Sequence, residues 1–152
     1  MVSKPKLERT ERRILHLLQH EGRLSHAEIG RRIGLSPTAV ADRIRDLEAE
    51  GVILGYAAIV DPRQVGFPIV AMIKMTCDGE RCRKLPGAVE ELPEVLECHR
   101  LTGDASAILK VVVPSIDALE TLIDRLTAFG KPSSSIVLST PFSMRPIPFD
   151  IA

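Results

Sequence analysis

The sequence lacks net charge, because its 152 residues include 20 basic and 20 acidic side chains. It is therefore not a strongly basic chain, the composition that by itself would favour binding to nucleic acid. The charges are nevertheless unevenly distributed, since residues 1–55 hold ten lysine and arginine residues against eight acidic ones. This mild basic excess has the sign expected of an N-terminal DNA-binding segment.

Long apolar runs are also absent. No stretch approaches the roughly 18 residues that a membrane span needs, and no signal-peptide pattern opens the chain, so we expect a cytoplasmic protein.

Cysteine is scarce, and Cys77, Cys82 and Cys98 fit no zinc spacing. An odd number of cysteines in a reducing compartment predicts free thiols.

One histidine pair has a spacing that metal sites use. His16 and His20 are four residues apart on a predicted helix, and two imidazoles so placed can bind a metal ion. The same spacing also describes one ordinary stripe of a helix surface. We favour the second interpretation, and predict no metal site, no cofactor and no catalytic residue.

Two helix starts with the same local pattern lie close together in the first third of the chain. At the first, Ser25 precedes Glu28 by three residues, the capping-box spacing that satisfies backbone N–H groups at a helix start. At the second, Ser36 is the predicted N-cap and Pro37 takes the first helical position. Gly34 ends the earlier helix, so only the turn "GLS" separates the two. This arrangement is typical of a helix-turn-helix.

A third helix, from about Thr10 to His20, precedes this pair and supplies leucine and isoleucine residues to a small core. In the last of the three helices, Val40, Ile44 and Leu47 lie within about 60° of one another at about 100° per residue. They form the predicted buried stripe. The side of the helix opposite to them is then free to meet a partner.

That opposite side carries Thr38, Asp42 and Arg45. In a helix-turn-helix it enters the major groove, where arginine favours guanine and a carboxylate accepts from cytosine or holds the arginine three residues away. Nearby arginines would contact phosphates, and Arg43 would contact a phosphate or form an internal ion pair. The other interpretation is a solvated face of mixed charge. The predicted DNA-binding residues are Arg23, Ser25, Arg31, Arg32, Ser36, Pro37, Thr38, Ala39, Asp42, Arg43 and Arg45.

The pattern changes after Gly51. The segment "VILGYAAIVD" is rich in β-forming residues and "PRQVGFP" interrupts it, which predicts a hinge. Strand-like segments "IVAMIKMTC", "VLECHRLTG", "SAILKVVV" and "SSSIVLST" then combine with a helical patch around Pro86 to Leu92 and a clear helix from Ser115 to Phe129. The order is βαββαβ, a ferredoxin-like pattern, so the fold class is α+β. The predicted parts are a domain at 1–55, a β-strand linker at 56–67 and a domain at 68–152.

The strands "IVAMI" and "AILKVVV" are nearly continuous apolar runs. An antiparallel sheet with one solvated face normally alternates, so we predict that both faces are buried. Two helices cover one face, and the economical cover for the other is a second copy of the sheet. Of Ile73 and Val111, we expect one to face the helices and the other to face that copy. A homodimer would also supply the two-fold symmetry of a palindromic DNA site.

Two long segments resemble a known family. The stretch from "LERTERRILHLLQHEGRLSHAEIGRRIGLSPTAV" to "VDPRQVG" is similar to the N-terminal part of the Lrp/AsnC (feast/famine) family of transcriptional regulators, and "EVLECHRLTGDASAILKVVV" and "SSSIVLST" are similar to its C-terminal amino-acid-sensing domain. The resemblance implies a winged-type helix-turn-helix that binds double-stranded DNA at a palindromic operator, joined by a β-strand linker to a βαββαβ sensing and oligomerisation domain. It also implies a homodimer that associates further, often to an octamer.

The resemblance implies an effector as well, an amino acid or a related metabolite, bound near the loop between the second and third strands. By position this loop holds Thr102, Gly103, Asp104 and Ser106. Gly103 lets the backbone approach a carboxylate, while Asp104 and the hydroxyls of Thr102, Ser106 and Ser135 would accept from the ammonium group. The family usually has aspartate where this chain has Ser106, so we expect a weaker amino-acid response or a different effector.

Two other functions fit parts of the sequence. Siroheme decarboxylase subunits, relatives of this family, keep a degenerate helix-turn-helix but act as enzymes on a tetrapyrrole, and "CHRL" places His99 beside Arg100. Neighbours on a strand point to opposite faces, so this pair is not expected to share a site. A loosely selective DNA-compacting protein would differ by a low affinity ratio between operator and random DNA. We favour the regulator, which is not an enzyme.

Overall fold

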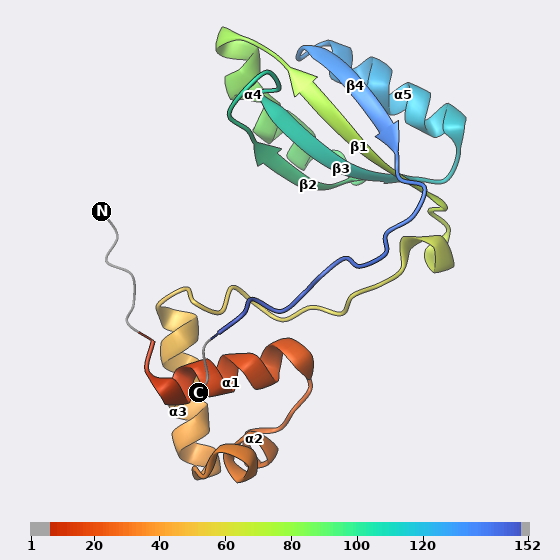
Figure 1. The fold of residues 1–152 in the computed structure, drawn as a ribbon. Coiled ribbons are helices and arrows are strands. Elements are labelled where there is room, and N and C mark those ends of the chain that lie inside the picture. The colour runs from red at the N-terminus through yellow and green to blue at the C-terminus, as the bar shows by residue number, and fades with distance from the viewer. Residues whose placement is uncertain (1–6, 150–152) are drawn as a thin grey trace. The chain divides into compact units, whose positions relative to one another are not determined.

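The computed structural model describes residues 7–149, whose path Figure 1 shows. They form two compact units: one joins the chain up to Ala58 to the tail from Phe142, and the other runs from Ile59 to Pro141. The predicted domains also include residues 1–6 and 150–152, which lie outside the described residues. The tail groups with the N-terminal helices, whereas the sequence assigned it to the second domain. No helix within 7–149 is long and apolar enough to cross a membrane.

Three helices make the first unit: α1 (Arg9–His20), α2 (His26–Ile33) and α3 (Pro37–Ala49). As the sequence predicts, the Ser25 hydroxyl accepts the Glu28 N–H at 3.2 Å, and the Ser36 hydroxyl accepts the Ala39 N–H at 3.1 Å. Gly34 ends α2 with a φ of 79°, a left-handed conformation that favours glycine. Local bonds therefore hold the "GLS" turn on both sides, and the predicted helix-turn-helix is confirmed.

The core of this unit contains the predicted stripe. Val40, Ile44 and Leu47 of α3 are buried in one cluster with residues of α1 and α2. Gly30 of α2 is buried where the helix meets the turn, and a β-carbon there would collide with the carbonyl oxygen of Leu35. The close approach of α2 to the turn therefore requires glycine at this position.

The segment predicted as a β-strand linker, residues 56–67, contains no strand. Most of it has no regular structure, and Pro62–Val65 forms a short 3-10 helix, η1, which the side chain of Asp61 caps. A strand needs a hydrogen-bonded neighbour, and none of the residues between 7 and 149 pairs with this segment. The apolar side chains of Ile59 and Val60 remain exposed as a result.

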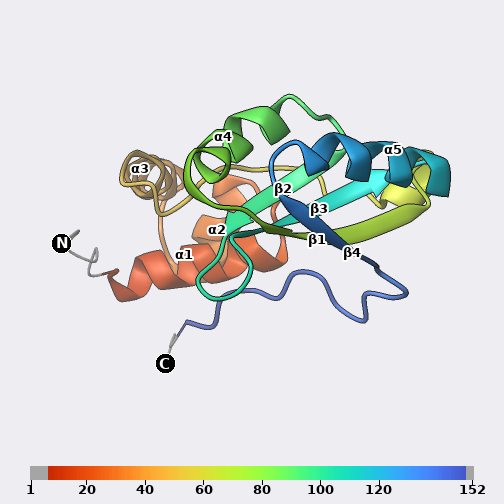
Figure 2. The same cartoon turned by 90° about the horizontal axis from the view of Figure 1, so that it is seen from above.

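The second unit has the predicted βαββαβ order. Its elements are β1 (Ile69–Thr76), α4 (Gly79–Glu90), β2 (Val95–Arg100), β3 (Ala107–Val113), α5 (Ile116–Thr127) and β4 (Lys131–Ile136). The strands form one antiparallel sheet in the order β2-β3-β1-β4, the ferredoxin-like arrangement. Figure 2 shows α4 and α5 on the same face of the sheet.

Helix α4 begins seven residues earlier than the sequence indicates. The predicted patch started at Pro86, a residue type that usually stands in the first turn of a helix. In the structure Pro86 lies inside α4, which starts at Gly79. Leu85 and Val89 are buried against the sheet. Their burial offsets the cost of an internal proline, about 3 kcal/mol.

Helices cover one face of the sheet and leave the other face open. Fully buried residues of β1 and β3 lie under α4 and α5, among them Ile73 and Val111. The expectation that one of these two would face a second copy is wrong, because the register pairs Ile73 with Leu109 and Ala71 with Val111 on the helix side. The alternate residues form the face that α4 and α5 leave uncovered, which we call the open face. Its members on β1 and β3 are Val70, Met72, Lys74, Ile108, Lys110 and Val112.

Candidate DNA interface and effector loop

The outward side of α3 presents the three polar residues that the sequence singles out. Thr38, Asp42 and Arg45 are all exposed. Arg45 Nη1 donates to Asp42 Oδ1 at 2.9 Å, yet 71% of the Arg45 side chain stays accessible. The ion pair holds the guanidinium along the helix, so less conformational freedom is lost when it meets a guanine edge.

Arg32 joins the first two helices. It donates to Glu28 at 2.9 Å and makes a two-pronged contact with Glu21. Its hydrogen bonds lower the pKa of Glu21, and those of Arg31 and Arg32 together lower the pKa of Glu28. Both carboxylates in turn raise the pKa of Arg32. Arg31 pairs with Glu28 alone and keeps 73% of its side chain accessible, so it is the better placed of the two for a phosphate.

Arg43 forms the internal ion pair that the sequence left open. Its Nη1 lies 3.4 Å from a carboxylate oxygen of Glu11 and 3.5 Å from one of Glu8, which ties α3 to the start of α1. Arg23 is exposed in the turn before α2. The remaining predicted DNA-binding residues gather at the N-terminal ends of α2 and α3: Ser25, Ser36, Pro37 and Ala39.

Arg13 has a role that the sequence did not indicate. Its two terminal nitrogens donate to the carbonyl oxygens of Arg32 and Ile33 at 3.1 and 3.4 Å. It thereby satisfies carbonyl groups at the C-terminal end of α2, where a cation is also favoured by the helix dipole. The contact joins residues about 20 positions apart, so no local pattern predicts it.

The predicted effector loop connects β2 to β3. The Leu101 N–H donates to the Ser106 carbonyl at 3.0 Å, and the Ser106 N–H donates to the Met75 carbonyl at 2.8 Å. Between these ties Thr102, Gly103 and Asp104 are exposed. Gly103 has a φ of 104°, which side chains of L-residues rarely allow. The loop thus exposes a glycine backbone beside one carboxylate and one hydroxyl.

The hydroxyl of Ser106 is engaged inside the unit. It accepts the Cys77 N–H at 3.1 Å and donates to the Cys77 carbonyl at 2.9 Å. Ser106 therefore anchors the loop to the segment that follows β1. An ionised aspartate, the residue that the resemblance leads us to expect here, could accept the Cys77 N–H but could not donate to the Cys77 carbonyl.

Ser135 is not brought to the loop. On β4 it lies opposite Met72, whereas the loop joins the sheet beside Met75 at the far end of β1. Three residues along a strand separate Met72 from Met75, about 10 Å at 3.3 Å per residue. The β4 residue at the loop end of the sheet is Lys131, opposite Thr76, and no local sequence pattern singles it out.

The prediction of free thiols is wrong for two of the three cysteines. Cys77 and Cys82 form a disulfide across the junction of β1 and α4. The fold brings their Cα atoms to 5.2 Å from each other, a separation at which a disulfide can form. Cys98 remains free, and partial burial raises the pKa of its thiol.

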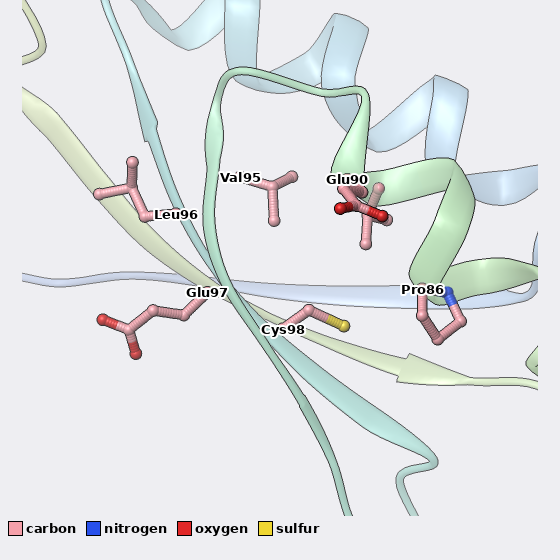
Figure 3. Close-up of a pocket in the computed structure, with 7 residues that line it drawn as sticks. Pro86, Glu90, Val95, Leu96, Glu97 and Cys98 are labelled. Atoms are coloured by element: carbon pink, nitrogen blue, oxygen red, sulfur yellow. The ribbon is translucent and has the colours of Figure 1, made fainter. Parts of the chain in front are cut away.

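Cys98 lies in an open groove of about 330 Å³ between α4 and the edge strand β2. Figure 3 shows the Cys98 side chain turned toward Pro86 of α4, while Glu97 points to the other side of the strand. Glu97 is engaged there by Lys110 and His99, whose hydrogen bonds lower its pKa. The groove is lined mainly by apolar side chains and offers no cluster of polar groups that would orient a ligand.

The neighbours His99 and Arg100 do not share a site. His99 lies opposite Ile108 on the open face, and Arg100 lies opposite Ala107 on the helix side. No group of three histidine, cysteine or acidic residues with metal-site geometry occurs within 7–149. The arrangement that a tetrapyrrole enzyme would use is therefore not assembled from this pair.

Comparison with known proteins covers both units. Residues 7–53 match the winged helix-turn-helix DNA-binding family, and residues 70–147 match the Lrp/AsnC ligand binding domain. The chain is 39% identical over 131 residues to the HTH-type transcriptional regulator YezC of Bacillus subtilis. The matched region covers 86% of this chain and 93% of that protein. It is 36% identical over 120 residues to the leucine-responsive regulatory protein of Escherichia coli K12, covering 77% of this chain and 73% of that protein.

Solved structures have the same fold. The feast or famine regulatory protein of M. tuberculosis, complexed with L-methionine, superposes with a TM-score of 0.85 at 33% identity, covering 91% of this chain and 97% of that chain. A transcriptional regulator of Neisseria meningitidis, also in complex with L-methionine, superposes with a TM-score of 0.86 at 29% identity. The superposition covers 94% of this chain and 97% of that chain.

Proposed function

The chain belongs to the Lrp/AsnC family of DNA-binding transcriptional regulators, and on this premise we propose that it binds a palindromic operator as a homodimer and that an amino acid alters this binding. The observation that carries the proposal is the accessible pair of Asp42 and Arg45 on the outward side of α3. Two relatives with solved structures bind L-methionine, and another is named for its response to leucine. These names support an amino acid as the effector class.

Base reading is assigned to three residues of α3. Arg45 donates to guanine, Thr38 reads a base edge nearer the helix start, and Asp42 either orients Arg45 or accepts from a cytosine amine. Arg23 and Arg31 contact phosphates, since both are exposed. Arg32 and Arg43 hold the helices together through their ion pairs and take a smaller part in binding.

The open face is the proposed dimer interface. Its apolar members Val70, Met72 and Ile108 are only partly buried and would be covered by a second sheet, and two copies would place two recognition helices about a two-fold axis. Further association of dimers, to an octamer, is the arrangement that the family suggests. A regulator that acts on chromosomal DNA works in the cytoplasm, which is the proposed location.

The effector is proposed to bind at the 101–106 loop. Backbone N–H groups near Gly103 receive the carboxylate, and Asp104 with the Thr102 hydroxyl receives the ammonium group. Ser106 supports the loop rather than the ligand, because its hydroxyl is already paired with Cys77. Ser135 lies too far along β4 to take part.

One experiment tests the whole proposal. The full-length protein is used to select binding sites from random duplex DNA, and affinity for the selected site is compared with a scrambled one at fixed salt. We expect a palindrome bound at least about 10³-fold more tightly than random DNA, as specific regulators are. The affinity measurement is repeated in the presence of each of the twenty amino acids, and at least one of them should change the affinity for the selected site. Equal affinity for both duplexes would favour the DNA-compacting alternative.

A further inference from the structure

The disulfide between Cys77 and Cys82 has no role in the proposed DNA interface. Cys77 directly follows β1, and Cys82 lies in the first turn of α4. Both residues are half-buried, so small reagents can reach them. In a reducing compartment structural disulfides are rare, and those that form are mostly transient or redox-sensing. A pair of this kind in a DNA-binding regulator therefore calls for a chemical explanation.

Cys77, together with Met75, also holds Ser106 of the effector loop. The Ser106 hydroxyl makes both of its hydrogen bonds to the Cys77 backbone. The junction of α5 and β4 packs on the same place: a β-carbon at Gly130 would lie 2.9 Å from the Cys77 β-carbon and 2.5 Å from the Thr76 carbonyl oxygen. Three segments far apart in the sequence therefore meet at Cys77.

The surroundings of Cys82 favour reactivity when it is reduced. Its backbone N–H donates to the Asp78 carbonyl at 3.4 Å in the first turn of α4, where the helix dipole stabilises an anion. A helix N-terminus increases the thiolate fraction of a cysteine. These surroundings favour Cys82 over Cys77 as the attacking thiol.

We propose that Cys77 and Cys82 form a thiol–disulfide redox site that reacts with low-molecular-weight disulfides and whose oxidation orders the effector loop. The Cys82 thiolate attacks one sulfur of the small disulfide, so that a mixed disulfide forms and one small thiolate leaves. The Cys77 thiolate then attacks the Cys82 sulfur, which forms the Cys77–Cys82 bond and releases the second small thiolate. The two protons of the cysteines pass to the released thiolates, so two cysteine thiols are oxidised and one small disulfide is reduced.

Oxidation acts on the loop through the backbone of Cys77. The bond closes a short ring, since the two cysteines are five positions apart. It restricts the segment that presents the Cys77 N–H and carbonyl to Ser106. Reduction releases this restriction, so the two Ser106 bonds open more often and the loop exchanges its amides faster. The link to effector binding rests on the proposed function of the loop.

The first test follows the thiols alone. Full-length protein is equilibrated with mixtures of oxidised and reduced glutathione, alkylated with iodoacetamide and analysed by mass spectrometry. Cys77 and Cys82 should become protected together as the oxidised fraction rises, while Cys98 stays reactive. Labelling of all three cysteines to the same extent at every ratio overturns the redox site.

The second test follows the loop. Amide hydrogen exchange of Leu101 and Ser106 should be about threefold or more faster in the reduced protein than in the oxidised one. Cys82→Ser should show the fast rate whatever the glutathione ratio, and Cys98→Ser, which leaves the pair intact, should respond as the wild type does. Equal exchange in both redox states of the wild type overturns the coupling. Calorimetry with amino acids then separates the redox proposal from the effector proposal. If hydrogen exchange depends on the redox state but no amino acid binds, the redox site is supported and only the effector assignment is refuted.

Discussion

Gln19 of α1 and Ile147 of the C-terminal tail are joined by two hydrogen bonds. Gln19 Nε2 donates to the Ile147 carbonyl at 3.3 Å, and the Ile147 N–H donates to Gln19 Oε1 at 2.7 Å. The glutamine amide thus gives the tail the donor and acceptor that a neighbouring strand would supply. Phe149 packs against the apolar cluster of the helices two residues later. The helical unit is therefore completed by the far end of the chain.

Replacing Gln19 should loosen the tail. Gln19→Ala removes both bonds, each worth about 0.5–1.5 kcal/mol net. We expect faster hydrogen exchange at the Ile147 amide, with the helices still folded by circular dichroism. Gln64→Ala, in the 3-10 helix of the other unit, is the matched control and should leave that amide unchanged. Unchanged exchange in Gln19→Ala would show that the tail is held by Phe149 alone.

Arg45 and Arg23 should separate specific from general DNA binding. Arg45→Ala should weaken binding to the selected site by about 1–3 kcal/mol and barely change affinity for random duplex. Arg23→Ala should weaken both alike and flatten the dependence on salt, because it removes a phosphate contact. Gel shifts at fixed salt on both duplexes make the comparison. Equal losses for Arg45→Ala on both would contradict its base-reading role.

Arg32 should contribute to stability in a pH-dependent way. The pKa values of Glu21 and Glu28 are lowered from 4.5 in the folded protein. Their contribution to stability is therefore fully present above about pH 4.5 and is lost as the pH falls through the lowered values. Arg32→Ala should melt at a lower temperature than the wild type at pH 7, and the difference should shrink below pH 4.5. Arg31→Ala, which leaves Glu21 paired, serves as the control. A constant difference down to acid pH would exclude the ion pairs as its source.

Two glycine replacements should have opposite effects. Gly30→Ala forces a β-carbon against the Leu35 carbonyl, and we expect a loss of about 1–3 kcal/mol in the free energy of unfolding. Gly87 lies inside α4 with open space around it, so Gly87→Ala should stabilise the protein by about 0.5–1 kcal/mol. Urea titration followed by circular dichroism measures both. A neutral Gly30→Ala would mean that α2 can shift away from the turn without cost.

Neighbouring residues of β1 should separate folding from assembly. Ile73→Asp places a charge in the core under α4 and α5 and should prevent folding. Met72→Asp places it on the open face and should give a folded monomer. Thr76→Asp, on the same face at the exposed end of the strand, should leave the dimer intact. Sedimentation at micromolar concentration with circular dichroism distinguishes these outcomes, and a wild-type monomer under those conditions would end the dimer proposal.

The sequence alone determined those features that arise from neighbouring residues. Ser25 and Ser36 begin helices because their hydroxyls satisfy N–H groups three residues ahead, an interaction that spacing reveals. Val40, Ile44 and Leu47 lie on one face because the helix repeats every 3.6 residues. The βαββαβ order follows from local composition, since apolar runs bounded by turn residues indicate the strands and an amphipathic period indicates the last helix.

Tertiary structure decided the pairings between distant residues. The side of the sheet on which Ile73 and Val111 lie depends on strand register, and a continuous apolar run contains no alternation from which to read it. Residues 56–67 have β-forming composition but no strand, because a strand exists only with a hydrogen-bonded partner. Ser106 and Cys77 are 29 positions apart, and only the fold of the sheet brings the hydroxyl of one to the backbone of the other.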